Sequence, residues 1–124
     1  MDPETDAVAD ALFAAIEAGD VDAIAELYDP AVEVWHNTDG VAEDRDANLR
    51  TLGWVVENLT DRRYEEIRRH PVPGGFVQQH VLRVTTASGR RVAVPACMVV
   101  AVEGGRITRI EEYLDSAHVA ALVG

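Results

Sequence analysis

Apolar side chains recur three and four positions apart in the first half of the chain, which is the spacing of an amphipathic helix. This pattern predicts helices over residues 5–18 and 44–59. Between them, a short helix is predicted to begin at residue 20 or 22. It should end before Pro30, because the residue that precedes a proline disfavours helical geometry. Three helices are therefore expected in this half of the chain.

Alternation of apolar and polar residues, the pattern of a half-buried strand, predicts the strands. One strand is expected over residues 31–37, between the second and third helices. After Asp61 the alternation continues almost to the end of the chain, interrupted only by short turns that contain glycine. It predicts four more strands, followed by a short final helix over residues 117–123; these strands are 62–72, 76–86, 91–103 and 106–116.

The order of the main elements is α-α-β-α-β-β-β-β, which indicates an α+β fold. Consecutive strands joined by short turns form an antiparallel meander, and the three helices are expected to cover one face of it. A strongly curved sheet covered in this way makes a cone with an interior cavity. At 124 residues the chain has the length of one such domain, so residues 1–124 are expected to form a single domain.

Composition and charge narrow the expected partners and location. The chain has 22 acidic residues against 11 basic ones, a net charge of −11, so nucleic acid is not an expected partner. No apolar run approaches the roughly 18 residues of a membrane span, and the N-terminal residues are acidic where a signal peptide is basic. The single cysteine, Cys97, cannot form an internal disulfide, so a cytoplasmic protein away from membranes is expected.

All the basic residues are arginine, and without lysine a side-chain Schiff base is excluded.

Two segments carry a family resemblance: AIEAGDVDAIAELYDPAVEVW (residues 15–35) and GGRITRIEEYLD (residues 104–115). They resemble the entrance and the closing strand pair of the ketosteroid-isomerase-like superfamily, also called the nuclear transport factor 2-like or SnoaL-like fold. The resemblance covers essentially the whole chain. It implies a small-molecule pocket inside the cone, no cofactor, and a homodimer formed through the outer face of the sheet. The run VAVPACMVVAV (residues 92–102) supports the dimer, because both of its faces are apolar.

Candidate site residues follow from the alternation of side chains across each strand, combined with the resemblance. Trp35 and Asn37 match strand positions where epoxide hydrolases of this superfamily carry a Tyr-x-Asn that holds the catalytic water. Glu112 matches their water-activating aspartate. Gln78 and His80 match their supporting Arg-x-Asp pair. These five residues are therefore expected to line one pocket.

The chemistry that this set implies is acid–base catalysis. A carboxylate in an apolar pocket can act as a base near neutral pH, so Glu112 is the expected catalytic base. His80 is expected to orient it or share its proton, and Trp35, Asn37 and Gln78 are expected to bind the substrate. A buried polar pair of purely structural role is the alternative interpretation of Glu112 and His80.

At several of these positions the chain has a different residue type from the known enzymes of the superfamily, and this limits the reactions that it can be expected to catalyse. Gln78 cannot carry the charge of the arginine it replaces, and His80 is not a carboxylate, so epoxide hydrolysis is disfavoured. Steroid isomerases need a tyrosine on the first helix, where this chain has Leu12 and Phe13. Polyketide cyclases use an acid–base pair, which His80 and Glu112 would supply.

His36 lies out of phase with Trp35 and Asn37, so it is predicted to face away from the pocket. A metal site is not expected, because the sequence has no H-x-x-x-H motif and no cysteine cluster.

Two functions fit the sequence. The first is a cofactor-free acid–base enzyme of the SnoaL-like type (an isomerase, cyclase, dehydratase or hydrolase) acting on an apolar, oxygen-bearing small molecule. The second is a non-catalytic ligand-binding or dimerisation module of the same fold, which the same pocket would serve equally well.

Overall fold

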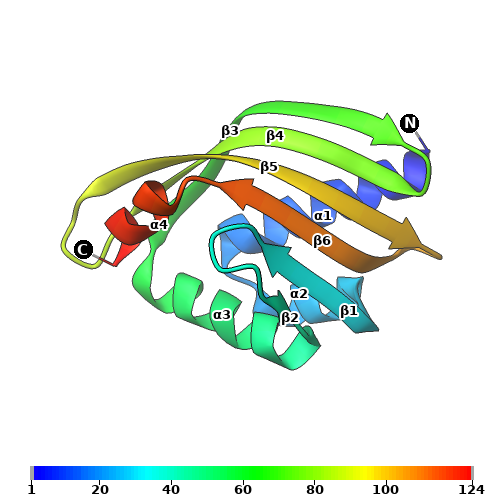
Figure 1. Ribbon diagram of the computed structural model, residues 1–124, viewed down its shortest axis with the longest axis horizontal. Coiled ribbons are helices and arrows are strands. Elements are labelled where there is room, and N and C mark those ends of the chain that lie inside the picture. The colour runs from blue at the N-terminus through cyan, green and yellow to red at the C-terminus, as the bar shows by residue number, and fades with distance from the viewer. Residues whose placement is uncertain (1, 124) are drawn as a thin grey trace.

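The computed structural model describes residues 2–123 and shows a strongly curved sheet with helices on its concave side (Figure 1). The elements confirm the predicted α+β cone, to which the structure adds the short strand β2. In chain order they are α1 (Pro3–Ala18), α2 (Val21–Leu27), β1 (Tyr28–His36), β2 (Ala42–Glu43), α3 (Arg45–Asn58), β3 (Thr60–Val72), β4 (Gly75–Thr85), β5 (Arg91–Glu103), β6 (Arg106–Leu114) and α4 (Ser116–Leu122).

The strands lie in the order β2-β1-β6-β5-β4-β3. Strands β3 to β6 form the predicted antiparallel meander. Strand β1 instead pairs with β6 in parallel, so the sheet is mixed and the expectation of a purely antiparallel sheet is wrong. This pairing places the end of β1 beside the end of β6, although the two strands are far apart in the chain.

Aspartates begin the helices. The side chains of Asp2, Asp20, Asp44 and Asp115 each accept a hydrogen bond from a backbone N–H in the first turn of the helix that follows. Such caps satisfy donors that have no partner inside the helix, and a negative charge there complements the helix dipole. Part of the large negative charge therefore has a structural role.

Irregularities in β3 contribute to the curvature of the sheet. Asp61 and Glu66 have φ angles of 50° and 52°, and each lies within a shift of the register between β3 and β4. Such bulges bend a strand. Pro95, in contrast, pairs with Val81 without a register shift, one residue beyond the last pair of β5 and β6, so it marks an edge and not a bulge.

Arg62 joins the C-terminal ends of α1 and α3. Its Nε donates to the carbonyl of Ile16 at 2.8 Å, its Nη2 donates to the carbonyl of Glu17, and its Nη1 donates to the carbonyl of Leu59. The last carbonyls of a helix have no partner within it, and a cation at this end is favourable.

Replacing Arg62 by methionine should therefore lower the free energy of unfolding by about 2–3 kcal/mol, because several partly buried carbonyls lose a charged donor. Urea denaturation measures the change. Arg63, which is exposed on the same strand, provides the matched control, and Arg63→Met should alter stability by less than about 0.5 kcal/mol. Equal effects of the two substitutions would contradict the role given to Arg62.

Candidate functional site

Two adjoining hollows lie inside the cone. The inner chamber has a volume of about 130 Å³ and is enclosed by α1, α3 and the concave face of the sheet. The outer chamber, of about 310 Å³, extends from it toward α4. Both are lined by His36 and Glu112, and by apolar side chains that include Val55 and Leu82. A small molecule with a polar group and an apolar body would match these walls.

His36 and Glu112 form the charged centre of the two chambers. The parallel register of β1 and β6 sets the two residues opposite each other, and His36 Nε2 lies 3.1 Å from Glu112 Oε1. Their side chains are 23% and 22% exposed, so water reaches them only in part. Among the described residues Glu112 Oε2 has no hydrogen-bond partner, which leaves one carboxylate oxygen free to meet a ligand.

The surroundings of His36 favour its protonated form. The hydrogen bond to Glu112 raises the pKa of His36, burial opposes this, and the charges of Glu112, Glu43 and Asp39 raise it further. A histidine whose pKa is higher in the folded protein than in the unfolded chain stabilises the folded protein at pH values below its unfolded-state pKa. That stabilisation is lost as the pH rises through its folded-state pKa.

We therefore expect His36→Gln to destabilise the protein more at pH 6 than at pH 9, by about 1–2 kcal/mol at the lower pH. Urea denaturation of both proteins at the two pH values measures the difference. His70→Gln, on the exposed part of β3, is the control and should cause no such pH-dependent loss. A loss that is equal at both pH values would contradict a charged His36–Glu112 pair.

Trp35 and Asn37 do not line either chamber, so their predicted place in the pocket is wrong. Trp35 packs edge-to-face against Tyr113 on the outer side of the sheet, with 5.4 Å between ring centroids. Asn37 joins the end of β1 to the end of β6, because its Oδ1 accepts a hydrogen bond from the backbone N–H of Leu114 at 2.9 Å. His36, predicted to face away, occupies the inward position instead. The sequence did carry a signal for this phase, because the apolar Val32 and Val34 share a face with His36 and the charged Glu33 does not. The structure buries both valines and exposes Glu33.

Gln78 and His80, from β4, are buried, but neither lines either chamber, so their predicted place in the pocket is wrong as well. Gln78 is fully buried and His80 is 4% exposed. Gln78 Nε2 lies 2.9 Å from His80 Nδ1. Within residues 2–123 no hydrogen bond joins His80 to Glu112, so the expected Glu112–His80 contact is replaced by the Glu112–His36 contact. Burial lowers the pKa of His80, against the opposing effect of the Glu112 charge.

The inner chamber also has polar side chains that the sequence pattern did not predict. The Tyr28 hydroxyl donates to Asn48 Oδ1 at 2.7 Å, and Asn48 Nδ2 donates to Glu43 Oε1 at 3.1 Å. Tyr64 also lines the chamber, and its hydroxyl has no hydrogen-bond partner among the described residues. Burial raises the pKa of both tyrosines, so each hydroxyl keeps its proton as a donor. Tyr28 ends an apolar helical pattern and Tyr64 lies in a polar strand, so neither pattern predicted an inward hydroxyl.

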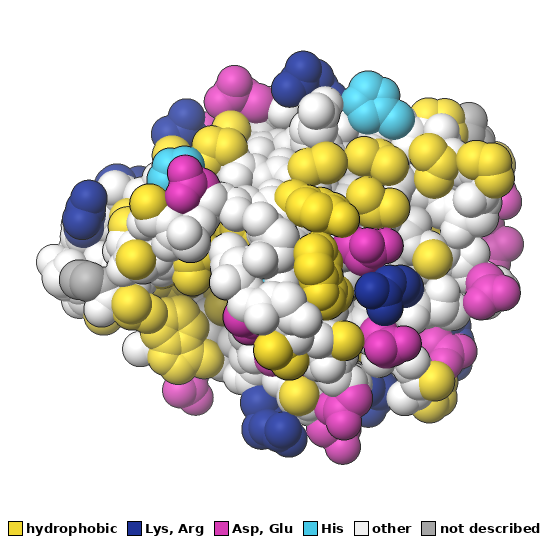
Figure 2. All heavy atoms as spheres, in the orientation of Figure 1, with side chains coloured by type: hydrophobic (Ala, Val, Ile, Leu, Met, Phe, Trp, Pro, Cys, Tyr) yellow, Lys and Arg dark blue, Asp and Glu magenta, His cyan; other side chains and the backbone are white. Residues whose placement is uncertain are grey.

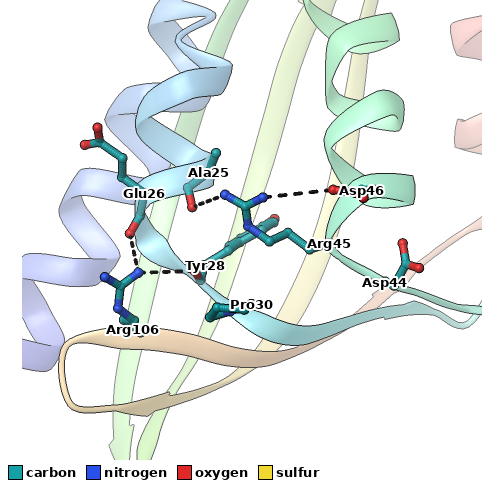
Figure 3. A pocket seen from close by; sticks show the side chains of 8 residues that line it. All are labelled: Ala25, Glu26, Tyr28, Pro30, Asp44, Arg45, Asp46 and Arg106. Carbon is teal, nitrogen blue, oxygen red and sulfur yellow. Dashed lines mark hydrogen bonds and ion pairs between the residues drawn. The ribbon is translucent and has the colours of Figure 1, made fainter.

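A wide groove of about 750 Å³ lies outside the cone, between α2 and the start of α3 (Figure 3). Two arginines cross it. Arg45 donates to the carbonyl of Ala25 at 3.0 Å, and Arg106 donates to the carbonyl of Glu26 at 3.2 Å. These carbonyls end α2 and lack helical partners, so the arginines stabilise the helix end. The arginines in this groove therefore have a structural role. No such role accounts for the two inner chambers, which remain the candidate site.

Within residues 2–123 no cluster of three or more histidine, cysteine, aspartate or glutamate side chains is arranged to hold a metal ion. None of the helices described is both long and apolar enough to cross a membrane.

Comparison with known proteins gives one family match for the sequence. Residues 9–110 match the sequence model of the SnoaL-like domain. No curated protein sequence matches the chain.

Three solved structures have similar folds. A candidate polyketide cyclase from Xanthomonas campestris pv. campestris shares 20% identity and a TM-score of 0.83, over 98% of this chain and 97% of that chain. An LEH-like epoxide hydrolase from M. tuberculosis shares 17% identity and a TM-score of 0.78, over 97% and 90%. A hypothetical protein of ketosteroid-isomerase-like fold from Catenulispora acidiphila, solved with trimethylamine, shares 14% identity and a TM-score of 0.80, over 93% and 90%. At these identities the likeness establishes the fold alone.

Proposed function

The chain belongs to the SnoaL-like domain family, and we propose that it is a cofactor-free acid–base enzyme acting on a small, apolar, oxygen-bearing molecule. The observation that supports this most is the contact between His36 and Glu112 inside two otherwise largely apolar chambers. Perturbed titratable groups that converge on a cavity mark candidate active sites. The names of similar structures, a candidate cyclase and an epoxide hydrolase, agree with small-molecule chemistry in this fold.

Glu112 is the proposed base, through its free oxygen Oε2. For a carbonyl ligand, the proton leaves the carbon next to the carbonyl for Glu112, and the electron pair of that C–H bond forms an enolate. The proton then returns to carbon, at the same or another position. Isomerisation and cyclisation of carbonyl compounds begin in this way, whereas in a hydrolase Glu112 would take its proton from a water molecule.

His36 is proposed to hold the Glu112 carboxylate in place, as its Nε2–H donates to Oε1. This replaces the role that the sequence suggested for His80. The hydroxyl of Tyr64, whose proton has no partner among the described residues, is a donor in the same chamber, suited to the oxygen on which negative charge develops. The Tyr28 hydroxyl already donates its one proton to Asn48.

Acetophenone in D₂O tests the proposal, because it combines an apolar ring with one carbonyl and three exchangeable protons. Deuterium incorporation into its methyl group, followed by proton NMR, should be faster with micromolar protein than in buffer alone. Binding without faster exchange would overturn the enzyme proposal and favour the non-catalytic binding module.

We also propose that two copies of the chain pair through the outer face of the sheet. Figure 2 shows hydrophobic side chains gathered over strands β4 and β5. Around a shallow hollow on this face lie Ile67, Val81, Pro95, Cys97 and Tyr113, of which Ile67 and Tyr113 are 48% and 43% exposed. Exposed apolar surface of this kind is typical of a protein interface.

Sedimentation should accordingly give twice the chain mass of 13.5 kDa at micromolar concentration. Tyr113→Glu should give a folded monomer, because a charge would be buried in the interface. Val41→Glu, at an apolar residue 54% exposed beyond β1, is the control and should remain a dimer. A monomeric wild-type protein would refute this proposal.

A further inference from the structure

The two chambers share one wall and differ in the rest of their lining. His36 and Glu112 line both, so a group that contacts them lies where the chambers meet. The inner chamber alone is lined by the tyrosines Tyr28 and Tyr64. The outer chamber adds apolar side chains from α3, β5, β6 and α4, and it is larger, at about 310 Å³ against about 130 Å³. The two ends of a bound ligand would therefore meet different surroundings.

Trp54 gives the outer chamber a flat aromatic wall. It lies on α3, and it is 41% exposed although the indole is large and apolar. The other tryptophan, Trp35, packs against the ring of Tyr113, whereas no aromatic ring within residues 2–123 packs against Trp54. An indole that is accessible beside a hollow offers a surface on which a planar apolar group can stack.

The final helix, α4, turns its apolar side toward the same chamber. Val119 and Leu122 are three residues apart, so they lie on one side of the helix, and both line the outer chamber. A surface helix ordinarily buries such a stripe against the core. No residue of α4 is buried, so the stripe is only partly covered. Since α4 lies at the end of the cone where α3 ends (Figure 1), an apolar group between the two helices would complete the cover.

The remaining charged residues of the outer chamber are acidic. Besides the proposed base and its histidine they are Asp39 and Glu43, and no arginine of the described chain lines either chamber. Glu43 accepts hydrogen bonds from the neutral side chains of Asn48 and Thr51, which leave its negative charge in place. A carboxylate on the ligand would be repelled by these charges. The walls therefore favour a ligand body without negative charge.

We propose that the ligand is a carbonyl compound with a flat apolar body that carries no negative charge, and that Trp54, Val119 and Leu122 determine which bodies are accepted. The carbonyl oxygen enters the inner chamber, toward the Tyr64 hydroxyl, and the body lies in the outer chamber between α3 and α4. This inference rests on the proposed function and deepens it, because it names the shape, charge and orientation of the ligand. The three side chains are ligand-binding residues, and proton transfer stays with Glu112.

Intermolecular nuclear Overhauser effects in the wild-type protein test the orientation. The probe is 2-acetylnaphthalene, a methyl ketone with two fused rings. Its ring protons should show contacts with the indole of Trp54 and the methyl groups of Leu122, and its acetyl methyl group should show contacts with the ring of Tyr64. The reverse pattern, or a bound ligand that contacts none of these residues, would overturn the inference.

The ratio of two dissociation constants measures what the outer wall contributes. Acetophenone and 2-acetylnaphthalene carry the same acetyl group and differ by one fused ring. The wild-type protein should bind the larger ketone about tenfold more tightly, because the extra ring buries more apolar area. Trp54→Ala and Leu122→Ala should each reduce this ratio about threefold or more, since the ring loses part of its contact.

Val123→Ala is the matched control for Leu122→Ala. Val123 is the next residue along the chain, is 72% exposed and does not line the chamber, so its loss should leave the ratio unchanged. A ratio that neither Trp54→Ala nor Leu122→Ala alters would overturn the inference. If these variants do not fold, the contacts in the wild-type protein decide.

The charge of the body is tested with 4-acetylbenzoate, which adds a carboxylate to the ring of acetophenone. It should bind at least about tenfold more weakly than acetophenone at pH 8, because the carboxylate would enter a chamber with acidic walls. Equal or tighter binding of 4-acetylbenzoate would contradict the inferred ligand class.

Deuterium exchange from acetophenone judges the proposed function separately. The expected contacts without faster exchange would refute the enzyme and leave the placement of the ligand standing. Faster exchange with the reverse contacts would refute the placement and leave the enzyme standing. If neither ketone binds at millimolar concentration, both are refuted.

Discussion

Replacing Gly75 by alanine is expected to lower the free energy of unfolding by about 4 kcal/mol or more, or to prevent folding. A Cβ atom at this position would lie 1.8 Å from the carbonyl oxygen of Val100 and 3.1 Å from Cα of Ala101, both in the backbone of β5. Backbone atoms inside a paired sheet cannot move aside as a flexible side chain can, so β4 and β5 would have to separate. Gly75 begins β4, the strand whose Leu82 lines both chambers.

Gly53→Ala is the matched control. Gly53 lies within α3, and a Cβ atom there would meet nothing within 4 Å. Alanine favours helix over glycine by up to about 1 kcal/mol, so this variant should be slightly more stable than the wild-type protein. Thermal and urea denaturation of both variants measure the contrast. A Gly75→Ala protein of wild-type stability would show that β4 and β5 are not packed as described.

The fold was predictable from the sequence because its signals are local. The spacing of apolar residues identified the helices, and the glycine turns after Asp61 separated strands that pair with their chain neighbours. The parallel pairing of β1 with β6 was not predictable in this way, because it joins segments from opposite ends of the chain and leaves no periodic pattern. That pairing is what brings His36 beside Glu112.

The site was predicted in part. Glu112 lines both chambers, as the resemblance implied, whereas Gln78 and His80 are buried but line neither, and the roles of all three in binding or catalysis stay predictions. Trp35 and Asn37 were assigned by resemblance to epoxide hydrolases, against the phase set by the apolar residues of β1. A burial pattern within one strand was the better guide than a motif from a distant relative.

Other expectations, which rest on length, on composition or on the family resemblance, stay predictions. These are the single domain, the cytoplasmic location, the lack of a cofactor and of a nucleic-acid partner, and the homodimer. The negative charge has gained a physical account, since several aspartates cap helices. Two more, Asp6 and Asp10, form ion pairs with Arg69 of β3.

Glu112→Gln should slow deuterium incorporation into acetophenone at least about 100-fold relative to the wild-type protein, the usual contribution of a general base. The amide has nearly the size of the carboxylate and can still bond to His36, but it cannot accept a proton at neutral pH. The dissociation constant of acetophenone should change less than about threefold, because the walls of both chambers are untouched. Glu103→Gln, at an exposed glutamate where β5 ends, is the control and should exchange at the wild-type rate.

The most direct test of the central claim, that Glu112 is a base inside the cone, is this exchange rate measured for the wild-type and Glu112→Gln proteins at equal occupancy by acetophenone. We predict exchange well above buffer for the wild-type protein and close to buffer for Glu112→Gln, with nearly equal affinities. Equal exchange rates for the two proteins at equal occupancy would contradict the claim.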